Sequence, residues 1–275
     1  PAPPGPGRRG RRHAYAESEQ AYQAADVALL SRHLLDEPVA MRFDRVRRWL
    51  LIVRGDGQLA SVSIDRNSNV VAWSLLHAAG AFRSVAVHGG EPHFLVDLGG
   101  LVAIERFDDG LMTDHAVTLA RPEPTSVWNG LDHLEGQAVI VQHGLSATRA
   151  TVASGTVTLP EPATSVTVGV PYAHEVEPLP LVVPDGSGIS LDRPYRPVRV
   201  VFRLLTTGAL RADTGAGLRA LDLGSPGGAG SFTGDVGVRA LGWRRRLERP
   251  PWRVSQDDPV PCTILSVTSE IKGNA

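Results

Sequence analysis

Short runs of alternating apolar and polar residues, separated by glycine-rich turns, constrain the fold of this chain most. Between residues 39 and 119 the pattern has a period of two, which is typical of half-buried β-strands. Asp-Gly and Gly-Gly pairs between such runs are strong hairpin signals. The predicted turns fall at residues 55–57, 65–69, 80, 89–90, 99–100 and 108–110. We expect about seven or eight strands in an up-and-down meander, enough for about two propeller-like blades.

Such a meander cannot protect its own edges. A closed propeller needs about four or more blades, so two blades leave strand edges open. Open edges must be covered by other modules or other chains. The 29 glycines and 21 prolines among 275 residues also favour many turns and short strands over long helices. The sequence therefore predicts a mainly β protein with little helix.

Residues 1–36 are predicted to form a basic N-terminal arm and a short helix. Proline and glycine dominate residues 1–15, which favours a solvated tail, and the alternative is an arm that grips a partner subunit or nucleic acid. Residues 17–35 lack both, and Asp26 is placed to cap a short helix that Pro38 ends. The clustered arginines are Arg8, Arg9, Arg11 and Arg12.

Three further modules follow the arm. Residues 37–121 form the blade-like meander, and the proline-rich residues 121–124 mark its end. Residues 122–174 are predicted to form a small β-sandwich, with a loop at Pro160 and Pro162. Residues 175–275 form a C-terminal β region, in which residues 198–205 are a clear strand candidate.

Charge and cysteine content narrow the function classes. With 28 basic and 29 acidic residues the net charge is −1, which excludes attraction of the whole chain to nucleic acid or an acidic membrane. Cys262 is the only cysteine, so no intramolecular disulfide can form. No apolar run approaches the roughly 18 residues that a membrane span needs.

The sequence shows no pattern of reaction chemistry. The glycine-rich residues 224–230 lack the Lys-Ser/Thr of a phosphate-binding loop, and no Gly-x-Ser-x-Gly occurs. His88, Glu91 and His93 could surround a metal, but ordinary strand and turn roles explain them better. The aspartate pairs at 108–109 and 257–258 suit turns. We therefore predict a protein that is not an enzyme, with no catalytic, metal-binding or cofactor-binding residues and no cofactor.

A second basic cluster lies near the C-terminus. A solvated turn is the favoured interpretation, and the alternative is a contact with DNA phosphate or an acidic partner. The cluster consists of Arg244, Arg245 and Arg246.

One nonapeptide, WNGLDHLEG, stands at the entry to the predicted sandwich. Asn129-Gly130 suits a tight turn, Leu131 and Leu134 suit core anchors, and Asp132 and His133 can bond nearby backbone. We interpret it as a structural motif and not as a binding site. Its residues are Trp128, Asn129, Gly130, Leu131, Asp132, His133, Leu134, Glu135 and Gly136.

This nonapeptide, with the short strands expected over residues 138–170, resembles a module of bacteriophage tail nozzle proteins, the tail tubular protein B family of short-tailed phages. Residues 55–59 (GDGQL) and 71–74 (VAWS) are similar to the blade hairpins that precede the module there. Residues 168–172 (VGVPY) and 256–261 (QDDPVP) fit the family pattern downstream. Nozzle chains are usually much longer, and this chain resembles only their C-terminal part.

The resemblance implies a structural virion protein of the tail, assembled in the host cytoplasm. Its partners would be a homo-oligomeric ring, other tail proteins and transient, non-specific DNA leaving through the ring, with the two arginine clusters as candidate contacts. An alternative is a receptor- or glycan-binding tail accessory, for which the residues to examine are Trp73, Trp128, Trp243 and Trp252. A hydrolase acting on the host envelope would need a nucleophile–base pair or paired carboxylates in a cleft, which the sequence does not show.

Overall fold

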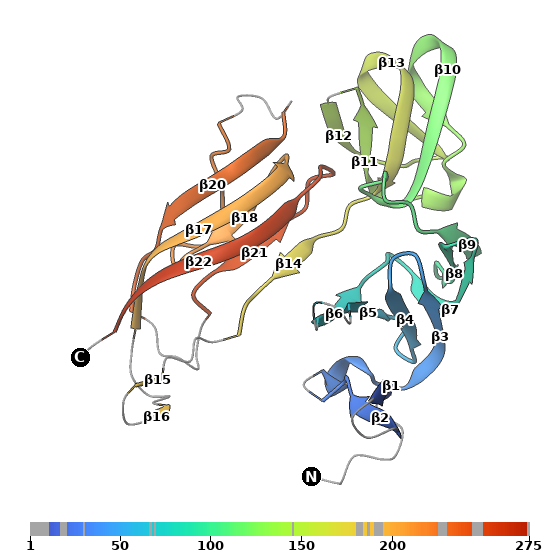
Figure 1. The fold of residues 1–275 in the computed structure, drawn as a ribbon. Coiled ribbons are helices and arrows are strands. Elements are labelled where there is room, and N and C mark those ends of the chain that lie inside the picture. The colour runs from blue at the N-terminus through green and yellow to red at the C-terminus, as the bar shows by residue number, and fades with distance from the viewer. Residues whose placement is uncertain are drawn as a thin grey trace. The chain divides into compact units, whose positions relative to one another are not determined.

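The protein is mainly β and divides into two compact units, Pro1–His115 and Ala116–Ala275 (Figure 1). The computed structural model describes residues 11–16, 21–29, 31–65, 68, 70–144, 146–179, 184–185, 188–189, 195–224, 230–243 and 250–273. Within these residues, helix is limited to two 3-10 turns, η1 (Arg32–Leu34) and η2 (Asp132–Leu134). None of the described residues forms a helix long and apolar enough to cross a membrane.

The first unit contains two antiparallel meanders whose strands follow the order of the chain. The first comprises β3 (Pro38–Asp44), β4 (Trp49–Arg54), β5 (Leu59–Asp65) and β6 (Val70–Leu76). The second comprises β7 (Ala81–His88), β8 (Glu91–Asp97) and β9 (Val102–Arg106). Apart from the turn between β3 and β4, for which no glycine signal was seen, the breaks between these strands fall at the predicted positions, so the predicted hairpins are confirmed up to residue 106.

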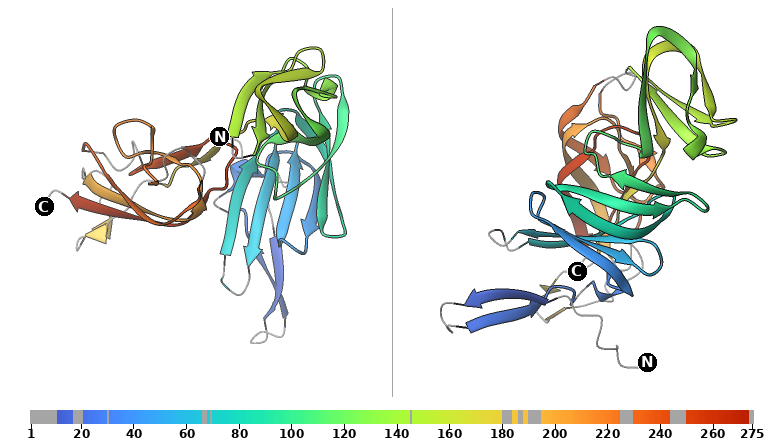
Figure 2. Two further views of the ribbon diagram at one scale, coloured as in Figure 1. Left: turned by 90° about the horizontal axis from the view of Figure 1, so that it is seen from above. Right: turned by 90° about the vertical axis from the view of Figure 1, so that its right-hand side faces the viewer.

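The two meanders stack face to face over one apolar core (Figure 2). β4 and β5 line one side of this core, and β7 and β8 line the other. Alternate residues of each strand point into it, because side chains two residues apart share a face of the sheet. The rings of Phe82 and Phe94 meet edge to face, with centroids 5.3 Å apart. Fully burying a large apolar side chain contributes about 1.5–3 kcal/mol, so this core holds the unit together. Its buried residues are Leu51, Val53, Leu59, Phe82, Val85, Phe94 and Val96.

Arg47, in the turn between β3 and β4, joins that turn to the second meander. Its Nη1 donates to the Asp44 carboxylate at 3.2 Å and to the Gly90 carbonyl at 2.9 Å. Its Nη2 donates to Asp109 at 2.7 Å, and the guanidinium lies 5.4 Å from the centre of the Phe107 ring. One side chain therefore ties three separate segments of the first unit.

The helix predicted over residues 17–35 is wrong. The structure has a hairpin there, β1 (Arg11–Ala16) with β2 (Ala21–Asp26), followed by a turn and η1. Asp26 does cap a backbone N–H, that of Ala28 at 3.0 Å, but in a turn. Ala28 and Leu35 pack on the outer face of the first meander, where Ile52 lies. Burial of these side chains on a sheet overrides their helical propensity.

The second unit begins with one four-stranded sheet, in the order β10 (Asp114–Asn129), β13 (Thr156–Val170), β11 (Ala138–His143), β12 (Ser146–Thr151). Figure 1 shows β10 and β13 as long, curved strands that run side by side. The sandwich predicted for residues 122–174 is thus a single curved sheet that folds over its own core.

The prolines expected to mark a boundary and a loop lie inside strands instead. Pro122 and Pro124 are exposed residues of β10, at the edge of the sheet. Pro160 and Pro162 are exposed residues of β13, outside the segment that β11 pairs with. A strand tolerates proline where the missing N–H would face solvent, so neither pair breaks its strand.

The rest of the second unit is a true two-layer sandwich. One layer is β20 (Phe232–Arg239), β17 (Tyr195–Thr207) and β22 (Thr263–Gly273). The other is β14 (His174–Val176), β21 (Arg253–Gln256), β18 (Arg211–Asp213) and β19 (Arg219–Ala220). Phe202 and Leu204 of β17 pack with Ala212 and Val254 of the opposite layer. The strand predicted over residues 198–205 is confirmed within β17. A short hairpin, β15 (Pro184–Asp185) and β16 (Gly188–Ile189), precedes β17.

Candidate functional site

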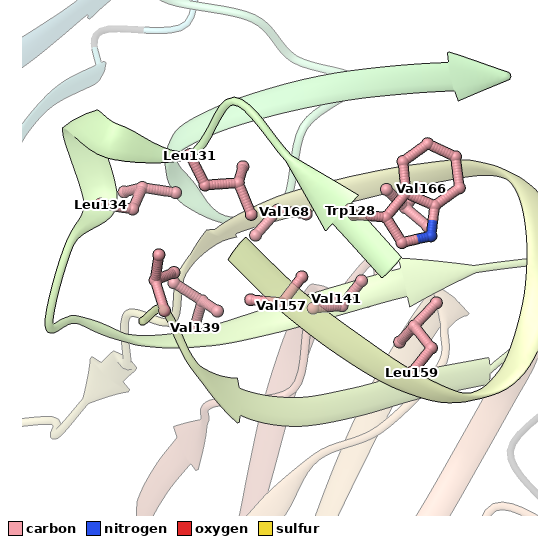
Figure 3. Close-up of a cluster of buried hydrophobic side chains, with 10 residues drawn as sticks. Trp128, Leu131, Leu134, Val139, Val141, Val157, Leu159, Val166 and Val168 are labelled. Atoms are coloured by element: carbon pink, nitrogen blue, oxygen red, sulfur yellow. The ribbon is translucent and has the colours of Figure 1, made fainter. Parts of the chain in front are cut away.

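The WNGLDHLEG segment is built into the core of the curved sheet. Trp128, near the end of β10, is the one fully buried residue of that strand; Gly130 then takes a left-handed turn (φ +89°), and η2 follows. Leu131 and Leu134 are buried in the same cluster as Trp128, so the predicted core anchors are confirmed (Figure 3). The buried cluster consists of Trp128, Leu131, Leu134, Val139, Val141, Val152, Val157, Leu159, Val166 and Val168.

Glu135 fixes the motif to the hairpin that follows β12. Its carboxylate accepts the N–H groups of Ser154 at 3.0 Å and Gly155 at 2.7 Å. These two residues have φ values of +52° and +62°, and Ala153 and Thr156 exchange backbone hydrogen bonds around them, as in a type I′ turn. The two N–H donors lower the pKa of Glu135. In the described structure Glu135 makes the backbone contacts that we had predicted for Asp132 and His133.

The predicted arginine contacts are largely untested by the structure. Arg8, Arg9, Arg244, Arg245 and Arg246 lie outside the described residues. Arg11 and Arg12 belong to strand β1, of which only the backbone is described. A role in binding DNA or a neighbouring subunit therefore remains a prediction.

The tryptophans proposed for a receptor site are mostly engaged in packing. Trp128 is buried, Trp73 donates its Nε1–H to the Val27 carbonyl at 2.9 Å, and Trp252 meets Phe202 edge to face. Trp243 is 55% exposed. Within the second unit, Trp128 and Trp252 pack in different apolar clusters.

The histidines and glutamate at residues 88–93 and the two aspartate pairs lie in strands, turns and loops of the structure. His93 Nδ1 contacts the Glu91 carbonyl at 3.0 Å, next to the paired residues His88 and Glu91. Asp108 accepts the N–H of Gly110 at 2.9 Å within a turn, and Asp257 pairs with Arg211 at 3.3 Å.

A buried cluster that the sequence analysis missed lies at the end of the first unit. It joins Glu105 of β9 to Asp114 and His115, the first residues of β10. The His115 side chain is only 3% exposed, and its backbone is left-handed (φ +49°). Nδ1 of the ring hydrogen-bonds to Glu105 Oε1, and Nε2 lies 3.4 Å from Asp114 Oδ2. One ligand atom from each residue lies within 4.8 Å of the others.

Burial and neighbouring groups have opposing effects on the pKa values of His115 and Asp114. Burial alone would lower the pKa of His115, but the hydrogen bond to Glu105 and the charges of both carboxylates raise it overall. Burial raises the pKa of Asp114, against the lowering effect of the Ala79 N–H that its Oδ2 accepts at 2.8 Å. The only sequence signal was an adjacent Asp-His pair, since Glu105 joins it through the path of the chain between β9 and β10.

A different feature concerns association with other chains. Val39, Met41 and Phe43 are 63%, 58% and 47% exposed, and they stand two residues apart on β3, an edge strand of the first meander. We call these three residues the β3 stripe. Met41 pairs with Ile52 and Phe43 with Leu50, so the stripe continues the apolar face that Ala28 and Leu35 cover elsewhere. At another edge, β9 exposes Val102 and Ile104.

Comparisons with known proteins leave the family open: no protein-family model and no curated protein matches this chain.

Proposed function

We propose that this chain is a structural virion protein, a nozzle-like ring component of the tail of a phage or phage-like particle, through which DNA exits. The proposal extends the resemblance of WNGLDHLEG and its flanking segments to the tail nozzle family. It places the protein in the virion tail, with other copies of itself and other tail proteins as partners.

The β3 stripe is the observation that carries this proposal. An edge strand offers unpaired backbone N–H and C=O groups, and natural proteins usually protect such edges with charge, proline or a covering segment. Here three exposed apolar side chains stand on such an edge strand. Full burial of a large apolar side chain is worth about 1.5–3 kcal/mol, and these half-exposed side chains would gain part of it under a neighbouring subunit.

The charge balance fits a conduit. A channel for DNA must bind phosphate weakly, because tight binding would stall passage. The net charge of −1 gives the chain no overall attraction to DNA, and local arginine clusters could supply transient contacts.

The assembly state tests the proposal. We expect light scattering and particle imaging of the purified chain to show a closed ring around a pore. Met41→Glu with Phe43→Glu should break the ring into smaller species without loss of β structure by circular dichroism. Leu179→Glu is the matched control, since Leu179 is 86% exposed and lies outside the strands. A chain that stays monomeric at high concentration, or a double variant that assembles like the unaltered chain, would refute it.

A further inference from the structure

The buried imidazole of His115 has one ring nitrogen bonded and one without a hydrogen-bond partner. Glu105 Oε1 takes the hydrogen bond of Nδ1. Nε2 is buried and has no hydrogen-bond partner among the described residues. When the ring is neutral, this hydrogen bond places its hydrogen on Nδ1 and leaves a lone pair on Nε2, as in the carboxylate–histidine pairs that support metal ligands.

A carboxylate oxygen of Asp114 lies close to this second ring nitrogen. Asp114 Oδ2 lies 3.4 Å from Nε2, and within the described part of the chain no donor bonds to both atoms. The Ala79 N–H that Oδ2 accepts holds the carboxylate in place. With the ring neutral and Asp114 ionised, both facing atoms are acceptors, and a cation bound between them would satisfy both.

We propose that His115 Nε2 and Asp114 Oδ2 bind a divalent transition-metal ion, with Zn²⁺ as the best fit, and that Glu105 orients the imidazole. Two ligand atoms at zinc distances of about 2.0–2.1 Å stand about 3.3–3.4 Å apart in a tetrahedral shell, which matches the separation of Nε2 and Oδ2. The imidazole nitrogen favours zinc over Mg²⁺ and Ca²⁺, which prefer all-oxygen sites. The inference is independent of the proposed tail function.

The exposure of the three side chains fits water as the remaining ligand. His115 is 3% exposed, whereas Asp114 and Glu105 are 21% and 22% exposed, so the site opens to solvent on the side of the carboxylates. Two protein ligands give a weaker site than the four of a structural zinc site.

Zinc binding to the full-length chain tests the proposal. After treatment with a chelator, the chain should bind one Zn²⁺ saturably in calorimetry, and Co²⁺ should give the absorption of a tetrahedral site. His115→Asn should abolish this binding, and asparagine tolerates the left-handed backbone at position 115. Glu105→Gln should weaken binding about 10–100-fold, because it perturbs the orienting partner.

The matched control is His88→Asn, which removes an exposed histidine at the end of β7 and should leave zinc binding unchanged. Circular dichroism confirms that each variant folds. In the unaltered chain, the ¹⁵N shifts of the His115 ring should move on addition of Zn²⁺. If both ring nitrogens instead carry protons at neutral pH and ignore Zn²⁺, the cation is a proton and the proposal is overturned. Zinc binding that survives His115→Asn would overturn it equally.

Discussion

Replacing Trp128 by alanine should destabilise the curved sheet severely, whereas replacing it by phenylalanine should change its stability little. Trp128 is fully buried in the cluster that holds Leu131 and Leu134. Truncating such a side chain to alanine costs about 3–5 kcal/mol, through lost burial and the cavity left behind.

For phenylalanine, opposing effects of similar size nearly cancel. The indole Nε1–H is buried and has no acceptor among the described residues, a cost of about 1–3 kcal/mol that phenylalanine removes. Against this, the smaller ring loses apolar contact worth about 1–2 kcal/mol. It also weakens the contact with the Arg121 guanidinium, 5.9 Å from the indole centre, by up to about 1 kcal/mol. We expect a net change within about 1 kcal/mol.

The assay is urea unfolding followed by far-ultraviolet circular dichroism, with hydrogen exchange of peptides from β11 and β13 as the local readout. The midpoint should fall strongly for Trp128→Ala and little for Trp128→Phe, with the slope m unchanged. If Trp128→Phe is as damaging as Trp128→Ala, the indole N–H has a partner and the reasoning fails.

Three further predictions concern the turn after β12 and the hydrogen bonds of Arg47. The lowered pKa of Glu135 means that its contribution is present above its unfolded pKa and is lost as the pH falls through its folded pKa. Glu135→Gln should therefore flatten the acid limb of a plot of unfolding midpoint against pH. Gly155→Ala should cost at least about 1–2 kcal/mol in urea unfolding, because φ is +62° and a Cβ would collide with the Asp132 carboxylate. Arg47→Ala should cost about 2 kcal/mol in thermal unfolding, and Arg47→Lys should recover less than half, since an ammonium cannot span the same acceptors.

The hairpins of the first unit were predictable because their turn chemistry is local. At residues 54–58, Asp56 accepts the N–H of Gln58 and Gly57 takes a positive φ, as the Gly-Asp-Gly sequence indicates. The apolar run at residues 49–53 likewise becomes β4, which has Leu51 and Val53 on one buried face and Ile52 on the other.

The N-terminal segment and the histidine cluster were not predictable, for a shared reason. The positions of Ala28 and Leu35 depend on a sheet made by later residues, and their helical propensity carries no information about it. Glu105 meets His115 only because β9 and β10 bring them together, which no spacing rule encodes.

The paired prolines of β10 decide where a neighbouring strand can add to the curved sheet. Pro122 and Pro124 are two residues apart, so their missing N–H donors fall on the same side of the strand. Because proline is tolerated in a strand where its missing N–H faces away from the ladder, we infer that this side is the free edge, and a strand added there would find two consecutive N–H donors missing. Docking by strand addition is thus directed to other rims, such as β12 at the far side of the same sheet or β3 in the first unit.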